Sequence, residues 1–436
     1  MLRWLINQFL PTADDAPSVS TRSETPQTAE IVPVADKVSG LLRRRAIYNR
    51  QWQIIAYTFS LRDLAYMSHS PEQAVSHDDI LLSEIERILA NQTLNTAIWI
   101  ELGWKSLPLL LKHHFHKELT IIAHGDIDDT AEDVDTMLQA LQSQYVIGAT
   151  AKRWHQTHPG IGKQITLIAL NVQSPDFAVL SQQVNTCRQI AAQAKLWVND
   201  VDSREAAEAC FQLGADFVSG RVFNWPEAQQ LAFPDSFLHL NRVMQMARQN
   251  ADAKLIADEL KTDPALSVRL LRYVNSAALG LAHSISNLDQ AIVVVGNQRL
   301  YRWLSLLLFS SKGDSTLDQT LLETALTRAR LMETAAATHL SAAECELLFL
   351  TGLFSLLDFL LRVPRAVLLK ELNPPQIVID TLCGQSTAFS PFLQLAEQSE
   401  VNWPSTTLLE QCQLTSSEFN RLQIEATLWT LSALAS

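Results

Sequence analysis

A chain of 436 residues is longer than one hydrophobic core usually serves, so we expect two folded domains of about 150 to 200 residues each. Hydrophobic residues make up 47% of the chain and charged residues 18%, which excludes a chain that is disordered throughout. The formal net charge of -12 argues against nucleic acid as the main ligand, because that affinity depends on Lys and Arg side chains that neutralise phosphates.

Residues 1–38 are predicted to form a disordered leader. The opening MLRWLINQFL is apolar but too short for a transmembrane segment, and it lacks a cleavage-site pattern, so we expect a cytoplasmic tail. An interfacial anchor is the alternative. Pro, Ser, Thr, Asp and Glu then dominate as far as residue 38. The five cysteines are odd in number and never form a CxxC pair, which favours reduced thiols in a cytoplasmic protein without a zinc site.

Residues 39–228 read as an α/β domain. Short runs rich in β-branched residues alternate with helix-like stretches, and they lie at residues 52–58, 96–102, 119–123, 145–150, 165–170 and 196–201. Apolar strands separated by helices indicate a parallel sheet that is covered on its faces. Periodicity alone does not separate a closed barrel from an open sheet.

Residues 229–436 read as an all-α domain, since the strand pattern stops after Phe233-Pro234. Asp263 is predicted to cap a helix that has Pro264 in its first turn. Ser286 together with Asp289 resembles a capping box at the start of the next helix.

The helical half resembles an HDOD domain, a bacterial all-helical module related to HD phosphohydrolases but lacking their metal site. The resemblance rests on DPALSVRLLRYVNSAALGL (263–281) and ISNLDQAIVVVGNQRL (285–300), with ELLFLTGLFSLLDFLL (346–361) as the following helix. HD hydrolases bind metal through an adjacent His-Asp pair, and the corresponding place here carries Ser355-Leu356.

The first half resembles an EAL domain, the barrel of cyclic di-GMP phosphodiesterases. RRRAIYNRQWQIIAYTFSLRD (43–63) is similar to its opening strand pair, and GADFVSGRVFNWPEA (214–228) to its closing strand. The two resemblances together imply an α/β plus all-α fold: a degenerate EAL-type, TIM-like (β/α) barrel at 39–228, followed by an HDOD domain at 229–436.

The EAL resemblance also implies where a catalytic metal pair would be held. Phosphodiester hydrolysis at two metals needs clustered carboxylates and a base. The Glu of Glu-Ala-Leu falls on Thr58, and Glu101 and Asp202 are the acidic side chains that remain. The full set of substituted positions is Thr58, Glu101, Ile122, Thr150, Ala151, Ala169, Asn199, Asp202 and Ser219. We therefore predict no bound metal, no cofactor and no enzymatic activity.

The resemblances imply a non-catalytic bacterial signalling adaptor that acts through a regulatory protein partner of a two-component or cyclic di-GMP pathway, in the regulation of motility or biofilm formation. Arg62 matches the family arginine that contacts substrate phosphate, so a non-hydrolysing cyclic di-GMP receptor is the alternative. An active phosphodiesterase is the least favoured hypothesis. The segment around Asn275, Ser276 and Gly280 is a candidate interaction surface, although the same residues suit a turn and a helix cap.

Overall fold

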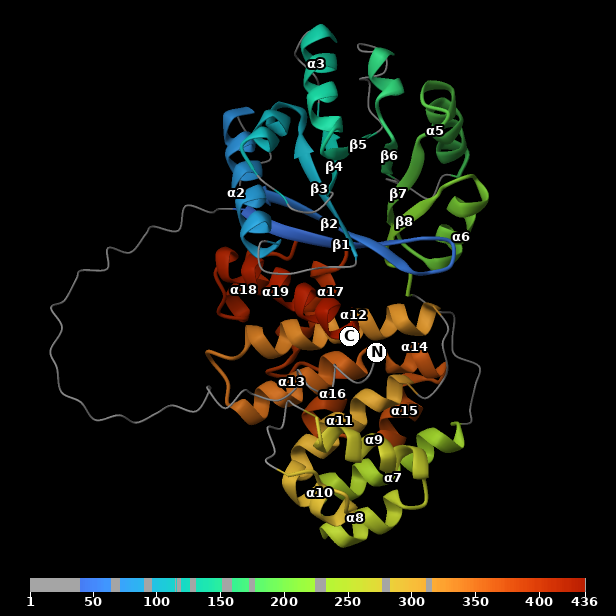
Figure 1. Ribbon diagram of the computed structural model, residues 1–436, viewed down its shortest axis with the longest axis vertical. Helices are drawn as coiled ribbons and strands as arrows, with labels where there is room; N and C mark the ends of the chain where they lie inside the picture. The colour runs from blue at the N-terminus through green and yellow to red at the C-terminus, as the bar shows by residue number, and fades with distance from the viewer. Residues whose placement is uncertain are drawn as a thin grey trace, which may run out of the picture.

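The structure is a computed structural model with a barrel at one end and a body of helices at the other (Figure 1). It describes residues 40–63, 71–89, 96–113, 115, 119–125, 131–150, 159–171, 177–223, 233–276, 283–310 and 316–435. The predicted leader at 1–38, Ala151 and Gly280 lie outside the described residues.

Eight strands form a closed barrel in chain order. β1 runs antiparallel to both of its neighbours, β2 and β8, and the remaining neighbours pair in parallel. The sheet is therefore a closed barrel and not an open sheet, two alternatives that strand periodicity alone could not separate. The strands are β1 (Gly40–Tyr48), β2 (Ile54–Asp63), β3 (Ala97–Gly103), β4 (Leu119–His124), β5 (Tyr145–Thr150), β6 (Leu167–Asn171), β7 (Lys195–Val201) and β8 (Phe217–Gly220).

Helices cover the outside of the barrel, and apolar side chains fill part of its inside. The covering helices are α2 (Pro71–Leu89), η2 (Trp104–Leu111), α3 (Ala131–Gln142), η3 (Pro159–Lys163), α5 (Phe177–Ile190) and α6 (Arg204–Gln212). Because side chains alternate along a strand, one set packs under these helices and the other points inward. The inner set includes Trp99 and Trp197, whose rings meet edge to face at 5.3 Å. The interior there is a packed core and not a channel.

The second body consists of helices only. They are α7 (Asp235–Arg248), α8 (Ala253–Leu260), α9 (Pro264–Val274), α10 (Leu288–Val295), α11 (Asn297–Leu307), η5 (Leu308–Ser310), α12 (Thr316–Ala335), α13 (Ala342–Phe354), α14 (Leu357–Leu361), α15 (Arg365–Leu372), α16 (Gln376–Leu382), α17 (Ser390–Ser399), α18 (Thr406–Gln411) and α19 (Ser416–Ala435). None of the described helices is both long enough and apolar enough for a membrane crossing. The predicted order, an α/β barrel followed by an all-α domain, is confirmed.

Two predicted helix starts have different outcomes. The Asp263 side chain accepts a hydrogen bond from the backbone N–H of Leu266 at 3.0 Å, so the predicted cap of α9 is confirmed. At α10 the predicted cap is wrong, because Asn287 and not Ser286 is the N-cap residue. The Asn287 side chain accepts from the N–H of Asp289 at 2.9 Å, so it already satisfies a free donor of the first turn.

The two bodies share packed surfaces. The α19 helix lies along β1, where the Asn420 amide accepts from Leu42 N–H at 2.7 Å and donates to the carbonyl of Gly40 at 2.9 Å (Figure 1). Leu41 of β1 belongs to the helical core, and Leu428 of α19 belongs to the core around the barrel. The apolar interior is therefore continuous across the junction.

Candidate functional site

An ion-paired cluster lies inside the barrel at strand positions where the EAL resemblance would place metal ligands. Arg43 and Arg45 of β1 point inward, because alternate residues of a strand share a face. Both guanidinium groups reach Glu101 of β3, and all three side chains are buried. Arg45 Nη2 makes the closest contact with Glu101 Oε1, and Arg43 Nη2 lies 3.5 Å from Glu101 Oε2. Thr58 of β2 donates its hydroxyl to Glu101 at 3.2 Å.

A bulge in β7 brings a second carboxylate to the cluster. The register of β7 shifts between Val198 and Val201, and Asp200 within the bulge has a positive φ of 58°. Its Oδ1 accepts from Arg45 Nη1 at 3.3 Å. Gly220 of β8 allows this arrangement, because a Cβ at that position would lie 2.0 Å from the carbonyl oxygen of Val201.

The electrostatics of the cluster keep Glu101 ionised. Burial alone would raise the pKa of its carboxyl, but the guanidinium groups of Arg45 and Arg43 outweigh that effect and lower the pKa to about 2. Two guanidinium groups therefore face the buried carboxylate of Glu101, and Arg45 also reaches the exposed carboxylate of Asp200.

The structure brings together some of the predicted site residues but not all of them. The Ser219 hydroxyl donates to Asn199 at 3.1 Å and accepts from the Trp197 indole at 3.2 Å. Ile122 and Ala169 belong to the apolar inner cluster. The other positions lie apart: Thr150 ends β5, Asp202 is exposed beyond β7, Ala151 is outside the described residues, and Arg62 has a described backbone opposite Leu41 but no described side chain.

These residues do not fit a pair of divalent cations. Such cations need several oxygen ligands at once, whereas Glu101 is held by two guanidinium groups and the side chains of Ile122 and Ala169 carry no ligand atom. Within the described ranges, no three His, Cys, Asp or Glu side chains are grouped as metal ligands.

The residues Arg43, Arg45 and Asp200 were not predicted as part of the site. A signal for the arginines was present, because Arg43, Arg44 and Arg45 are consecutive in a strand with apolar ends, and charged side chains of a strand buried on both faces must be paired. Asp200 had no such signal, since its direction depends on the bulge.

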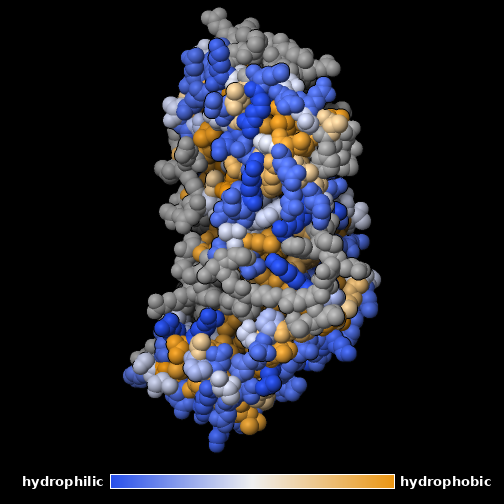
Figure 2. All heavy atoms as spheres, turned by 90° about the vertical axis from the view of Figure 1, so that its right-hand side faces the viewer, coloured by the Kyte–Doolittle hydropathy of each residue, from blue (hydrophilic) through white to orange (hydrophobic). Residues whose placement is uncertain are grey.

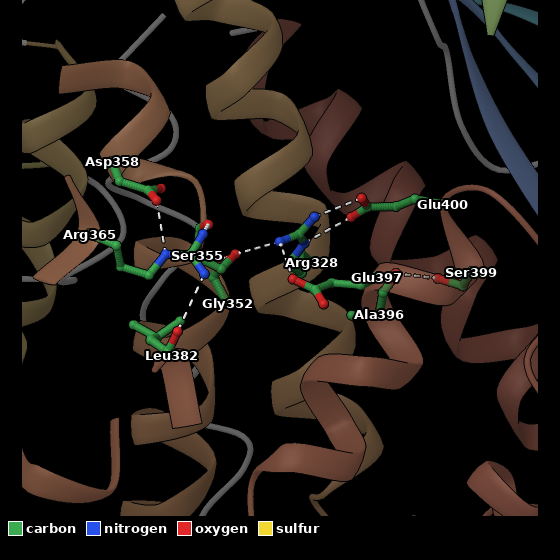
Figure 3. Close-up of polar contacts among 10 residues, drawn as sticks. All are labelled: Arg328, Gly352, Ser355, Asp358, Arg365, Leu382, Ala396, Glu397, Ser399 and Glu400. Atoms are coloured by element: carbon green, nitrogen blue, oxygen red, sulfur yellow. Dashed lines mark hydrogen bonds and ion pairs between the residues drawn. The ribbon is translucent and has the colours of Figure 1, made fainter. Parts of the chain in front are cut away.

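Arginine also reaches the place where an HD hydrolase would carry its His-Asp pair (Figure 3). Arg328 of α12 donates to the Ser355 hydroxyl at 2.8 Å and forms ion pairs with Glu400 at 2.7 Å and Glu397 at 3.2 Å. Arg365 donates to the Ser355 carbonyl at 3.1 Å and pairs with an Asp of α14. That Ser355-Leu356 binds no metal stays a prediction.

A protein-family model matches part of the helical half. Residues 231–360 match the family model of the HDOD domain. The second half of this chain contains an HDOD domain. Residues 263–281 and 285–300, which carried the resemblance in the sequence, lie inside the matched range.

Two curated proteins are similar to the chain that carries this HDOD domain. The uncharacterized protein YuxH of Bacillus subtilis (strain 168) is 23% identical over 411 residues, which are 88% of this chain and 97% of YuxH. The cyclic di-GMP phosphodiesterase CdgJ of Vibrio cholerae is 29% identical over 175 residues, which are 39% of this chain and 40% of CdgJ.

Solved EAL structures are also similar to part of the chain. An EAL domain protein from Listeria monocytogenes EGD-e has a TM-score of 0.32 and 15% identity, and the match covers 43% of this chain and 88% of that one. The Bacillus subtilis YkuI protein, solved with cyclic di-GMP and calcium, has a TM-score of 0.34 and 14% identity over 51% of this chain and 72% of its own.

Within the HDOD domain, Asn275 has a structural role after α9. Its amide donates to the Ile285 carbonyl at 2.7 Å and accepts from the Ile285 N–H at 2.6 Å. These bonds hold the two ends of the segment between α9 and α10 together. Ser276 follows it on the described backbone. The role of this segment as an interaction surface stays a prediction.

Proposed function

We propose that this protein is a non-catalytic signalling adaptor that does not hydrolyse cyclic di-GMP. The observation that carries the proposal is the pairing of Glu101 with Arg43 and Arg45. A metal-dependent hydrolase needs its carboxylates available to cations. Here a buried ion pair would have to be broken first, at a cost of about 3–5 kcal/mol.

The similarity to CdgJ and to EAL proteins, together with the HDOD domain, supports a place in bacterial cyclic di-GMP signalling. Loss of hydrolytic chemistry from both halves leaves their surfaces as the parts that can act.

Figure 2 shows small groups of hydrophobic residues among hydrophilic ones at the lower end, where α8 and α10 lie. Val293 is 70% exposed, Leu255 58% and Val268 46%, and they lie on the successive helices α10, α8 and α9. The helix α10 packs against both α8 and α9, and we assign the exposed apolar side chains of these three helices to a protein partner.

Turnover is tested with the purified full-length protein and cyclic di-GMP in the presence of Mn²⁺ or Mg²⁺. We expect no linear dinucleotide or mononucleotide product above the buffer control, while an active EAL phosphodiesterase under the same conditions gives product. Metal-dependent turnover by this protein would contradict the proposal.

The partner surface is tested by crosslinking and affinity capture in the host. We expect Val293→Asp to remove the proteins captured by the wild type without lowering the melting temperature, because this side chain is exposed. Val367→Asp on α15, whose wild-type side chain is 36% exposed, is the matched control and is expected to retain them. Equal capture by both variants would remove this surface from the proposal.

The second candidate, a cyclic di-GMP receptor without hydrolysis, is favoured by Arg62, which matches the phosphate-contacting arginine of EAL domains. Calorimetric titration with cyclic di-GMP separates the two candidates. Binding heat that is lost in Arg62→Ala would favour the receptor, and no heat with the wild type would favour the adaptor.

A further inference from the structure

A cavity lies between the barrel and the helical body. Its volume is about 420 Å³, which is within the range of about 300–1,000 Å³ typical of small-molecule sites. β1 and β2 form one wall, and α12, α17 and the residues after α13 form the other. This volume is far more than a single buried water would need.

Arg44 of β1 lines the cavity from the barrel side and is buried, with 3% of its surface exposed. It points away from the barrel interior, opposite to its neighbours Arg43 and Arg45. Its Nη1 lies 3.3 Å from the Thr427 hydroxyl, and its guanidinium lies 5.2 Å from the Tyr57 ring. Among the residues that the structure describes, no carboxylate lies within ion-pairing distance of Arg44 and its Nε has no hydrogen-bond partner.

Glu323 of α12 interacts electrostatically with Arg44 but forms no ion pair with it. Tyr57 donates its hydroxyl to Glu323 Oε1 at 2.7 Å. Burial raises the pKa of the Glu323 carboxyl to about 7, although the Tyr57 hydrogen bond and Arg44 act in the opposite direction. A carboxyl that is protonated for much of the time near neutral pH compensates Arg44 only weakly.

The carboxylates of the opposite wall, Glu400 and Glu397, are both ion-paired with Arg328, as Figure 3 shows. The lining as a whole has more arginine than glutamate side chains. Arg221, whose side chain is exposed, adds a further positive charge to the lining. The balance of the lining is therefore positive on the side of Arg44. A buried cation without an ion-paired carboxylate is costly, and a bound anion would offset that cost.

We propose that this cavity is a binding site for a small organic phosphate of about mononucleotide size, with the phosphate on Arg44 and Arg221. Guanidinium groups suit phosphate because they offer several N–H donors in one plane. The rings of Tyr48, Phe223 and Phe359 in the lining suit a flat organic body. This site is separate from the barrel interior and does not depend on the proposed adaptor function.

Thermal shift and calorimetry with AMP, GMP, inorganic phosphate and uncharged adenosine test the proposal on the full-length protein. We expect AMP or GMP to raise the melting temperature, inorganic phosphate to raise it less, and adenosine to leave it unchanged. Arg44→Gln should weaken nucleotide binding by at least about tenfold. Arg421→Gln, which removes an exposed ion-paired arginine of α19, is the matched control and should bind as the wild type does.

Arg44→Gln has a second expected effect that a structural arginine would not show. Without ligand, the variant should melt at the wild-type temperature or above it, because an uncompensated buried charge has been removed. Arg221→Gln at its exposed position should weaken binding without affecting folding.

Three results would overturn the assignment: no shift with either nucleotide, equal shifts with phosphate alone, or a nucleotide shift that Arg44→Gln retains. Retention of the nucleotide shift in Arg62→Ala is expected and separates this site from a cyclic di-GMP site at the barrel.

Discussion

Arginine side chains hold positive charge inside this barrel, next to the carboxylate of Glu101. The buried Arg43, Arg45 and Glu101 meet in one ion-paired cluster, and Arg45 also pairs with the exposed Asp200. A guanidinium group stays charged at any physiological pH and directs its donors along fixed lines. It can therefore stabilise a carboxylate permanently, but it leaves no open coordination position for a water or a phosphate.

Glu101→Gln should lower the free energy of unfolding by about 3–5 kcal/mol, because it leaves two buried guanidinium groups without their main partner. Urea denaturation followed by circular dichroism measures the change. Asp202→Asn, at an exposed position just beyond β7, is the control and should stay within about 0.5 kcal/mol of the wild type. A Glu101→Gln variant as stable as the control would mean that the ion pairs contribute nothing.

The same carboxylate predicts a pH dependence. Because the folded pKa of Glu101 is lowered from 4.5 to about 2, its contribution to stability is complete above pH 4.5 and is lost as the pH falls toward 2. The difference in unfolding free energy between the wild type and Glu101→Gln should therefore shrink over that window. Denaturation series at several pH values measure it, and a constant difference would contradict the lowered pKa.

Thr58 and Glu101 could be predicted from the sequence as residues of one site, but the partners of Glu101 could not. Thr58 and Glu101 could be placed because each lies in an apolar strand that carries its own pattern. The partners of Glu101 come from β1 and from a bulge, and a contact between distant segments has no local pattern. Asn287 replaced Ser286 as the cap of α10 for a simpler reason, since neighbouring Ser and Asn residues are both good caps.

At the scale of elements, α12 and α13 approach each other unusually closely at Gly352. A Cβ on this residue would lie 2.6 Å from the Cα of Ala329. Gly352→Ala would add about 1 kcal/mol of stability in an exposed helix. Here we expect a loss of about 1–3 kcal/mol, because the helices must move apart. Thermal unfolding measures whether Gly352→Ala lowers or raises stability, and a raised melting temperature would show that the helices are not in close contact.

The contact between β2 and α12 should respond to pH through Glu323. Its folded pKa is raised from 4.5 to about 7, mainly by burial, so folding is disfavoured as the group ionises. Stability from this group is therefore lost as the pH rises from 4.5 to 7. Glu323→Gln should equal the wild type at the acidic end and exceed it by about 1–2 kcal/mol above the window, since the side chain is only partly removed from solvent. Urea denaturation of both proteins below pH 4.5 and above pH 7 measures the difference in unfolding free energy. Equal stability of the variant and the wild type above pH 7 would contradict the raised pKa.

At the scale of the whole molecule, the barrel and the helical body are connected by more than a linker. Polar contacts join them as well, since Thr320 of α12 donates to the carbonyl of Trp52, and Asn420 binds the backbone of β1. Interfaces between domains of one chain are often small and permit relative motion. A continuous apolar interior instead favours a fixed arrangement.

This continuity predicts that the full-length protein unfolds in one calorimetric transition, because neither body can lose its structure without exposing apolar surface of the other. Leu428→Ala removes an α19 side chain that is 2% exposed and packs into the barrel core, so it should cost about 2–5 kcal/mol. The single transition should move to lower temperature or separate into two, with the barrel melting first. Leu255→Ala, whose wild-type side chain is 58% exposed on α8, should leave the transition in place. Two well-separated transitions in the wild type would mean that the shared core does not couple the domains.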